Sequence, residues 1–176
     1  MIAAYLSLLR WVTRHWLCWA LLASALMLAI AHAFERFGGL PPCLLCLKQR
    51  EVYWAAMAVA AVGIGAGYLF KKPLVTRLFC AALAVVFLYG MGLATWHAGA
   101  EWKWWPGPEA CAIDKNASFS AGGINDLLGG AEQKMPACDV ALWHFLGLSM
   151  AGWNVLISLK LAVLSALAAL GFGVRK

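Results

Sequence analysis

The chain has 176 residues, of which 64% are hydrophobic and only 12% are charged, and its formal net charge is +6. A soluble domain carries about 25% charged residues, so this composition excludes an ordinary soluble protein and indicates an integral membrane protein. In a membrane protein the positions of the basic residues carry more information than their sum, and we expect no nucleic-acid partner.

Four stretches of the sequence contain no acidic or basic residue, apart from Lys160 in the last of them. The first three, residues 16–34, 52–70 and 78–96, have 19 residues each, close to the roughly 20 that cross about 30 Å of hydrocarbon as a helix. Because backbone groups in a bilayer must be hydrogen-bonded within their own segment, these stretches predict helices. We expect an all-α membrane protein with one domain, residues 1–176, that forms a four-transmembrane-helix bundle. The expected spans are about residues 15–35, 45–70, 75–97 and 145–171.

The first stretch also has features of a secretory signal peptide. Arg10 and Arg14 precede an apolar run that ends at Ala31-His32-Ala33. The apolar run of a signal peptide has about 7–15 residues. The run here is longer, and three further spans follow it. We therefore expect this segment to remain in the protein as its first helix.

The basic residues predict the orientation. One side of the predicted bundle is strongly basic, with Arg10, Arg14, Lys71, Lys72, Arg77, Arg175 and Lys176. The opposite side has Arg36 in a short loop, about residues 36–44, and three lysines with six acidic residues in a long loop, about residues 98–143. The positive-inside rule then predicts a multi-pass protein with both termini in the cytoplasm and both loops outside, which for a bacterial inner membrane is the periplasm.

Four of the six cysteines lie on the predicted periplasmic side: Cys43, Cys46, Cys111 and Cys138. In an oxidising compartment the simplest interpretation is two structural disulfides, and Cys111–Cys138 fits it as a link that closes part of the long loop. Cys43 and Cys46 fit it poorly, because a Cys-x-x-Cys ring constrains almost no chain. Their position at a helix start would lower a thiol pKa, which favours redox chemistry. The other two, Cys18 and Cys80, are expected to pack as small apolar residues.

Two further residues could act beside the Cys-x-x-Cys pair. Arg50 lies four residues after Cys46 on the same helical face. It could stabilise a thiolate there or polarise a ligand carbonyl, and the alternative is an arginine whose guanidinium reaches the lipid headgroups. His97 ends the third span at the same level, either as an ordinary interfacial histidine or as a hydrogen-bond donor to something bound between the helices.

Two segments of the chain have a distinctive sequence. Residues 42–50 read Pro-Cys-Leu-Leu-Cys-Leu-Lys-Gln-Arg, and residues 145–150 read Phe-Leu-Gly-Leu-Ser-Met. With four spans and two further loop cysteines, the chain resembles the bacterial disulfide bond formation protein B (DsbB) family over essentially its whole length. The resemblance implies a quinone-dependent thiol oxidase, with ubiquinone or menaquinone as cofactor. Such an enzyme re-oxidises a thioredoxin-like periplasmic oxidase of the DsbA type and so supports disulfide bond formation in the periplasm.

The same resemblance implies a role for each site residue. The partner would attack the Cys111–Cys138 disulfide at Cys111. Cys138 would then attack Cys43, and Cys46 would leave as a thiolate beside Arg50 and pass electrons to the quinone. His97 and Met150 match positions near the quinone ring. The resemblance implies no metal. His144 is a departure, since an acidic residue is common at this position in the family.

Three other functions are compatible with parts of the pattern. A membrane transporter of soft metal cations would use thiolate pairs, but the predicted cytoplasmic side has no close cysteine pair to receive the metal. A structural protein with two passive disulfides does not account for the exposed Cys-x-x-Cys. A protein similar to vitamin K epoxide reductase would also have four helices, but it usually carries this motif late in the bundle, whereas here the motif opens the second span.

Overall fold

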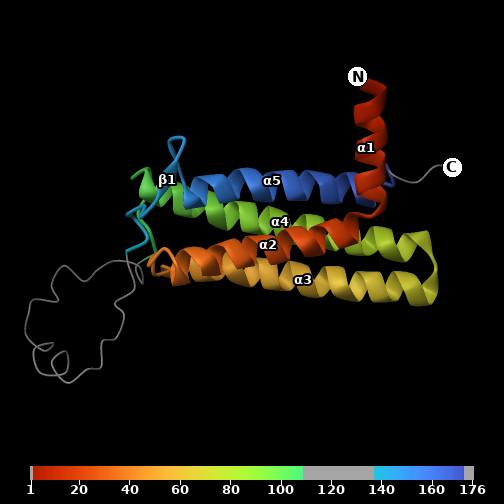
Figure 1. Ribbon diagram of the computed structural model, residues 1–176, viewed down its shortest axis with the longest axis horizontal. Helices are drawn as coiled ribbons and strands as arrows, with labels where there is room; N and C mark the ends of the chain where they lie inside the picture. The colour runs from red at the N-terminus through yellow and green to blue at the C-terminus, as the bar shows by residue number, and fades with distance from the viewer. Residues whose placement is uncertain (1, 109–136, 173–176) are drawn as a thin grey trace, which may run out of the picture.

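A computed structural model of the chain describes residues 2–108 and 137–172. Four long helices lie side by side in Figure 1: α2 (Trp16–Arg36), α3 (Leu44–Phe70), α4 (Pro73–Glu101) and α5 (Met150–Ala169). All four are long and apolar enough to cross a membrane. The predicted four-helix membrane bundle is therefore confirmed, and the first three charge-free stretches lie inside α2, α3 and α4.

An additional helix, α1 (Ile2–Arg14), precedes the four spans and crosses the end of the bundle at a steep angle (Figure 1). Tyr5, Leu8 and Trp11 are exposed on it, whereas Thr13 is buried. His15 separates α1 from α2 with a non-helical ψ of 27°. An amphipathic helix set across a bundle is typical of segments that lie in the membrane interface. The sequence does not predict α1 as a span, because Arg10 and Arg14 interrupt its apolar run.

Local sequence explains where the spans begin and end. Cys43 is the N-cap of α3, and its sulfur accepts a hydrogen bond from the Cys46 backbone N–H. Lys71, with a φ of 51°, ends α3 in the left-handed conformation, and Pro73 is the first residue of α4. Both features are common at these positions, because a left-handed residue satisfies the last carbonyls of a helix and proline has no N–H to lose at the first turn. The result is a tight turn between α3 and α4.

The fourth span begins at Met150, a few residues later than the position near 145 that the sequence predicts. Before it lies a short hairpin in which β1 (His144–Phe145) pairs antiparallel with β2 (Leu148–Ser149). Leu146 and Gly147 both have positive φ, as a two-residue hairpin turn requires. Ser149 then caps α5 by accepting a hydrogen bond from the Gly152 N–H. The distinctive segment 145–150 is therefore a turn and a helix cap.

The interior of the bundle is built from small and polar residues, and many of the large apolar ones face outward. Ala20, Ala56, Ala60 and Ala94 are completely buried, as are Ser24 and Ser165, and Leu83 and Phe87 are the large apolar residues buried with them. Small residues allow helices to approach closely in lipid, where there is no hydrophobic force between them. Lys160 is exposed on α5, so it faces outward, away from the buried Asn154.

Candidate functional site

A cavity of about 140 Å³ lies at the end of the bundle that contains the α2–α3 connection. Its lining comes from α2, the start of α3, the end of α4, the start of α5 and the segment 137–143. Five of the residues selected from the sequence line it: Cys43, Cys46, Arg50, His97 and Met150. Most of the remaining lining is apolar, and it includes Phe34 and Trp143, whose rings lie 5.2 Å apart. Residues that are distant in the sequence therefore converge on one chamber.

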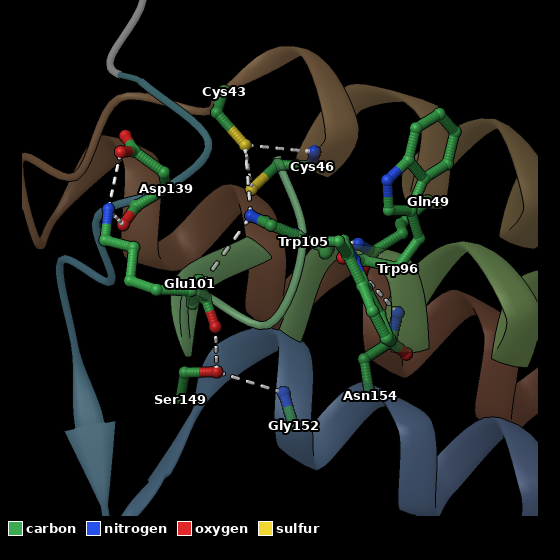
Figure 2. Close-up of polar contacts among 12 residues, drawn as sticks. Cys43, Cys46, Gln49, Trp96, Glu101, Trp105, Asp139, Ser149, Gly152 and Asn154 are labelled. Atoms are coloured by element: carbon green, nitrogen blue, oxygen red, sulfur yellow. Dashed lines mark hydrogen bonds and ion pairs between the residues drawn. The ribbon is translucent and has the colours of Figure 1, made fainter. Parts of the chain in front are cut away.

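The cysteine pair is present as free thiols. The sulfurs of Cys43 and Cys46 are 3.0 Å apart and point toward one another (Figure 2). A disulfide bond is about 2.05 Å long, so a small movement would close the ring. The hydrogen bond between the two thiols, together with the one between Cys43 and His97, lowers the pKa of Cys43 well below its usual value, although burial opposes the shift. In this dithiol state the thiolate is therefore favoured at Cys43.

His97 is 4% exposed and contacts both the thiol pair and an acidic residue. Its Nε2 lies 3.6 Å from the Cys43 sulfur and 3.6 Å from Oε1 of Glu101. Glu101 is almost as buried, and its other carboxylate oxygen accepts a hydrogen bond from the Ser149 hydroxyl (Figure 2). The carboxylate thus ties the end of α4 to the cap of α5, directly below the cysteines.

A chain of hydrogen bonds fixes the proton of His97. The Tyr53 hydroxyl donates to Oδ1 of Asn154 at 2.5 Å, and Nδ2 of Asn154 donates to Oε1 of Gln49 at 2.6 Å. The Gln49 amide nitrogen lies 3.0 Å from Nδ1 of His97. An amide NH₂ can only donate, so Nδ1 accepts, and neutral His97 carries its proton on Nε2. The imidazole therefore presents an N–H to the Cys43 sulfur and to Glu101.

Arg50 lines the cavity, but its hydrogen bonds go to α2. One guanidinium nitrogen lies 2.5 Å from Oε2 of Glu35, and the other donates to the Ala31 carbonyl at 3.1 Å. Its side chain is 15% exposed. The expected stabilisation of a Cys46 thiolate by Arg50 stays a prediction, because the guanidinium is paired with Glu35 here. Glu35 could be found only from the packing of α2 against α3.

Cys138 is 1% exposed, is disulfide-bonded and packs with Cys43 and Leu45 in one cluster. The next residue is held to the end of α4, because Lys103 Nζ lies 2.5 Å from Oδ2 of Asp139 and 2.8 Å from its carbonyl oxygen. Cys111 lies outside the described residues. The structure thus brings one loop cysteine against the membrane-edge pair, across 95 residues of sequence from Cys43.

A reactive dithiol, a buried histidine and a neighbouring disulfide around a chamber at one end of a membrane bundle define a membrane thiol oxidoreductase. The model of the family described as Disulfide bond formation protein DsbB matches residues 13–168. The chain belongs to the DsbB family, whose members are membrane oxidants of DsbA that support disulfide bond formation in the periplasm.

Relatives named Disulfide bond formation protein B span most of the chain. The Methylococcus capsulatus protein is 31% identical over 153 residues, which cover 85% of this chain and 86% of the relative. The Nitrosococcus oceani protein is 29% identical over 141 residues, covering 80% and 82%. The Pasteurella multocida protein is 29% identical over 163 residues, covering 85% and 82%. No solved structure is significantly similar to the chain.

Sequence reasoning missed four polar residues that hold the site together: Glu35, Tyr53, Glu101 and Asn154. One signal was present for two of them. Tyr53 follows Gln49 by four residues on α3 and faces Asn154 on α5, so polar groups repeat at helical spacing inside otherwise apolar spans. Polar residues within a membrane segment usually face the bundle interior and mark a site.

Proposed function

We propose that this chain transfers electron pairs from a DsbA-type dithiol in the periplasm to a membrane quinone, ubiquinone or menaquinone, through two successive disulfides. The observation that carries the proposal is the packing of Cys138 against Cys43 at a cavity that Cys46 also lines. A disulfide exchange requires the attacking sulfur to reach the disulfide directly. The arrangement supports a path for electrons from Cys138 in the loop, through the Cys43–Cys46 pair, into the cavity.

The proposed first exchange occurs at the loop disulfide, Cys111–Cys138. A partner thiolate bonds to Cys111, and Cys138 leaves as a thiolate. The second partner thiol then releases Cys111 as it closes the partner's own disulfide. Each exchange breaks one S–S bond and forms one, so the partner loses two electrons and the loop pair gains them.

The second exchange moves the electrons to the membrane edge. Cys138 bonds to Cys43, and Cys46 leaves as a thiolate on the side of the cavity. Attack of Cys111 on the Cys43–Cys138 bond then restores the loop disulfide and leaves the Cys43–Cys46 pair reduced. The low pKa of Cys43 in the dithiol state makes it a good leaving sulfur in that step, because exchange is faster when the departing thiol is more acidic.

The residues around the chamber fit a quinone. A quinone is a flat apolar ring with two carbonyl oxygens, and it accepts two electrons and two protons when it is bound. Apolar side chains, including Phe34, Trp143 and Met150, can pack against such a ring. The N–H of His97 Nε2 and the guanidinium of Arg50 are donors that a carbonyl oxygen requires. Glu101 and the thiols are the groups nearest to His97 that can exchange protons.

The orientation follows from the distribution of charge over the four spans. The turn between α3 and α4 carries Lys71 and Lys72, and α1 carries Arg10 and Arg14 at the same end of the bundle (Figure 1). The positive-inside rule puts this end in the cytoplasm and the cysteine site in the periplasm. Attaching a membrane-impermeant label to cysteines introduced at Lys72 and at Phe37 tests this: in intact spheroplasts only Phe37→Cys is expected to react.

The central experiment follows quinone absorbance while reduced DsbA is added to the purified protein. Wild-type protein should reduce quinone through many turnovers. Cys43→Ser and Cys46→Ser should each abolish turnover, whereas Cys18→Ser, which removes an exposed cysteine at the other end, should leave it within about 2-fold of wild type. Turnover that survives loss of either Cys43 or Cys46 would refute the proposed path.

A further inference from the structure

Three soft donor atoms meet at the cysteine pair. The sulfurs of Cys43 and Cys46 and the Nε2 atom of His97 all lie within 4.8 Å of one another. Cys43 and Cys46 are 3.0 Å apart, and Cys43 is 3.6 Å from His97. In a tetrahedral zinc site with bonds of about 2.3 Å to sulfur and about 2.1 Å to nitrogen, neighbouring ligand atoms are about 3.5–3.8 Å apart. The two sulfurs would need to separate by less than about 1 Å to reach that spacing, and Cys43 and His97 are already at it.

A fourth donor lies next to His97, outside the group of three atoms that are within 4.8 Å of one another. Oε1 of Glu101 lies 3.6 Å from Nε2 of His97, which is again the edge length of a tetrahedral site, and its side chain is 6% exposed. Two thiolates, an imidazole and a carboxylate match zinc and its heavier congener cadmium, and the thiolates disfavour magnesium or calcium. The donors come from α3 and α4 and are already buried together.

The hydrogen-bond chain behind His97 can support a metal-bound imidazole. A bound histidine must use the lone pair of Nε2, so its proton moves to Nδ1 and needs an acceptor there. If the amides of Gln49 and Asn154 each turn over, Oε1 of Gln49 accepts from Nδ1, and the Gln49 NH₂ donates to Oδ1 of Asn154. Asn154 then donates to the Tyr53 hydroxyl, which lies 3.3 Å from the Ser158 hydroxyl and can donate to it. Each side chain in this chain therefore keeps a hydrogen-bond partner when the direction of donation is reversed.

We propose that the reduced Cys43–Cys46 pair, with His97 and Glu101, is a binding site for a thiophilic divalent cation of the zinc class. Binding displaces the two thiol protons and transfers no electrons. The disulfide form lacks the two thiolates, so the cation and the Cys43–Cys46 bond exclude one another. A bound cation therefore holds the enzyme in its reduced form and stops turnover. This arrest rests on the proposed function, whereas the binding itself does not.

The binding test isolates this pair from the loop cysteines. The full-length Cys111→Ser/Cys138→Ser variant is reduced, freed of quinone and titrated in detergent with Co²⁺, which reports tetrahedral thiolate ligation by its visible absorption. We expect one equivalent to bind and Zn²⁺ to displace it. The same protein with its Cys43–Cys46 disulfide closed should show no such bands. Equal binding by the oxidised and reduced forms would overturn the proposal.

Variants assign the ligands. Cys43→Ser and Cys46→Ser should each abolish the charge-transfer absorption, and His97→Gln should weaken binding by at least about 10-fold. Cys80→Ala and His32→Gln, which remove a cysteine and a histidine elsewhere, should bind as tightly as the parent. Gln49→Leu removes the acceptor for Nδ1 and should weaken binding about 10- to 100-fold. Gln49→Glu keeps an oxygen acceptor and should bind at least as tightly as the parent, which separates this role from a loss of folding.

The two proposals fail separately. In the wild-type protein, Zn²⁺ should stop quinone reduction only after the pair has been reduced, and a chelator should restore it. Binding of Co²⁺ by a protein that does not reduce quinone would refute the proposed function and leave the metal site standing. Quinone reduction that is unaffected by Zn²⁺, together with no Co²⁺ spectrum, would refute the metal site alone.

Discussion

Cys43 and Cys80 are both almost fully buried, with 4% and 2% of their surface exposed, at opposite ends of the bundle. Cys80 belongs to an apolar cluster with Trp16, Leu83 and Phe87. The Cys43 thiol is hydrogen-bonded to the Cys46 thiol, accepts a hydrogen bond from the Cys46 backbone N–H and lies beside His97. Burial alone makes a thiol inert, whereas burial among donors favours the thiolate. A buried cysteine is therefore a packing group at the Cys80 end and a reactive group at the Cys43 end.

The two ends also use arginine differently. At the site end, Arg50 pairs with Glu35 and the Ala31 carbonyl at the wall of the cavity. At the opposite end, Arg77 donates to the carbonyls of Ala169 and Leu170, at 3.0 and 2.6 Å, and so caps the last turn of α5. A cation at a helix C-terminus satisfies carbonyls that have no partner within the helix. Arg77 therefore has a purely structural role. Arg50 also links two helices, but in addition it lines the cavity.

The largest expected effect comes from removing the donor to Cys43. In the Cys111→Ser/Cys138→Ser background, Cys46→Ala should return the pKa of Cys43 toward the usual value of about 8.5. The pKa of Cys43 is lowered in the parent, so the thiolate is kept at neutral pH and lost only as the pH falls through that lowered value. At pH 6, alkylation of Cys43 by iodoacetamide should therefore be slower by about 100-fold in the variant. The rate of alkylation against pH, followed by mass spectrometry, measures this.

Two matched variants sharpen that result. His97→Leu removes the weaker donor, so the midpoint of the pH profile should move in the same direction by a smaller amount. Cys80→Ala changes a cysteine in the apolar cluster and should leave the profile of Cys43 unchanged. An identical profile in the parent and in Cys46→Ala would remove the distinction between the two buried cysteines.

The comparison of Arg50 with Arg77 predicts that one substitution affects quinone use and the other affects stability. Arg50→Met should raise the KM for quinone by about 10-fold, the effect of losing one charged hydrogen bond of about 1.5 kcal/mol, with the Cys43–Cys46 disulfide still able to form. Arg77→Met should leave this KM within about 2-fold and lower the free energy of unfolding by about 1 kcal/mol, through two lost hydrogen bonds to backbone carbonyls. Quinone titrations and thermal unfolding in detergent measure the two quantities. Equal KM values for Arg50→Met and wild type would remove Arg50 from the proposed quinone site.

The sequence predicts the bundle well because the membrane imposes a simple rule on it. A run of about 20 residues without charge must be a helix in lipid, and α2 to α5 follow from that rule. It also predicts the convergence of Cys43, Cys46, His97 and Met150, because each lies at the same end of its span. The rule does not predict helix α1, since α1 lies across the bundle and contains two arginines.

The partners of these residues could not be predicted, because they depend on how the helices rotate and pack. Gln49 and Asn154 are 105 residues apart, and their hydrogen bond exists only once α3 faces α5. The pairing of Arg50 with Glu35 likewise depends on the contact of α2 with α3. Helical spacing shows that two residues share a face, but it does not show which neighbouring helix that face meets. For the same reason the sequence favours a low pKa at Cys46, next to Arg50. In the structure the groups that lower a thiol pKa in the dithiol state surround Cys43 instead.

The smallest expected effect concerns the exposed ion pair between Lys103 and Asp139, which are 63% and 47% exposed. An exposed pair contributes at most about 1 kcal/mol, but this one holds the residue that follows Cys138 to the end of α4. Lys103→Met should therefore slow electron transfer from Cys138 to Cys43 by about 2- to 5-fold. Single-turnover quinone reduction after mixing with reduced DsbA measures it.

Lys48→Met is the control for that variant, since it breaks the equally exposed pair with Glu51 on α3, away from the Asp139 segment. Its single-turnover rate should equal that of the wild type. Added salt should slow the wild type toward the rate of Lys103→Met and should leave Lys103→Met nearly unchanged, because salt screens a pair that the variant lacks. The same salt dependence in both proteins would mean that the ion pair does not position Cys138, and that its contact with Cys43 is maintained by the packing of the buried sulfurs and Leu45 alone.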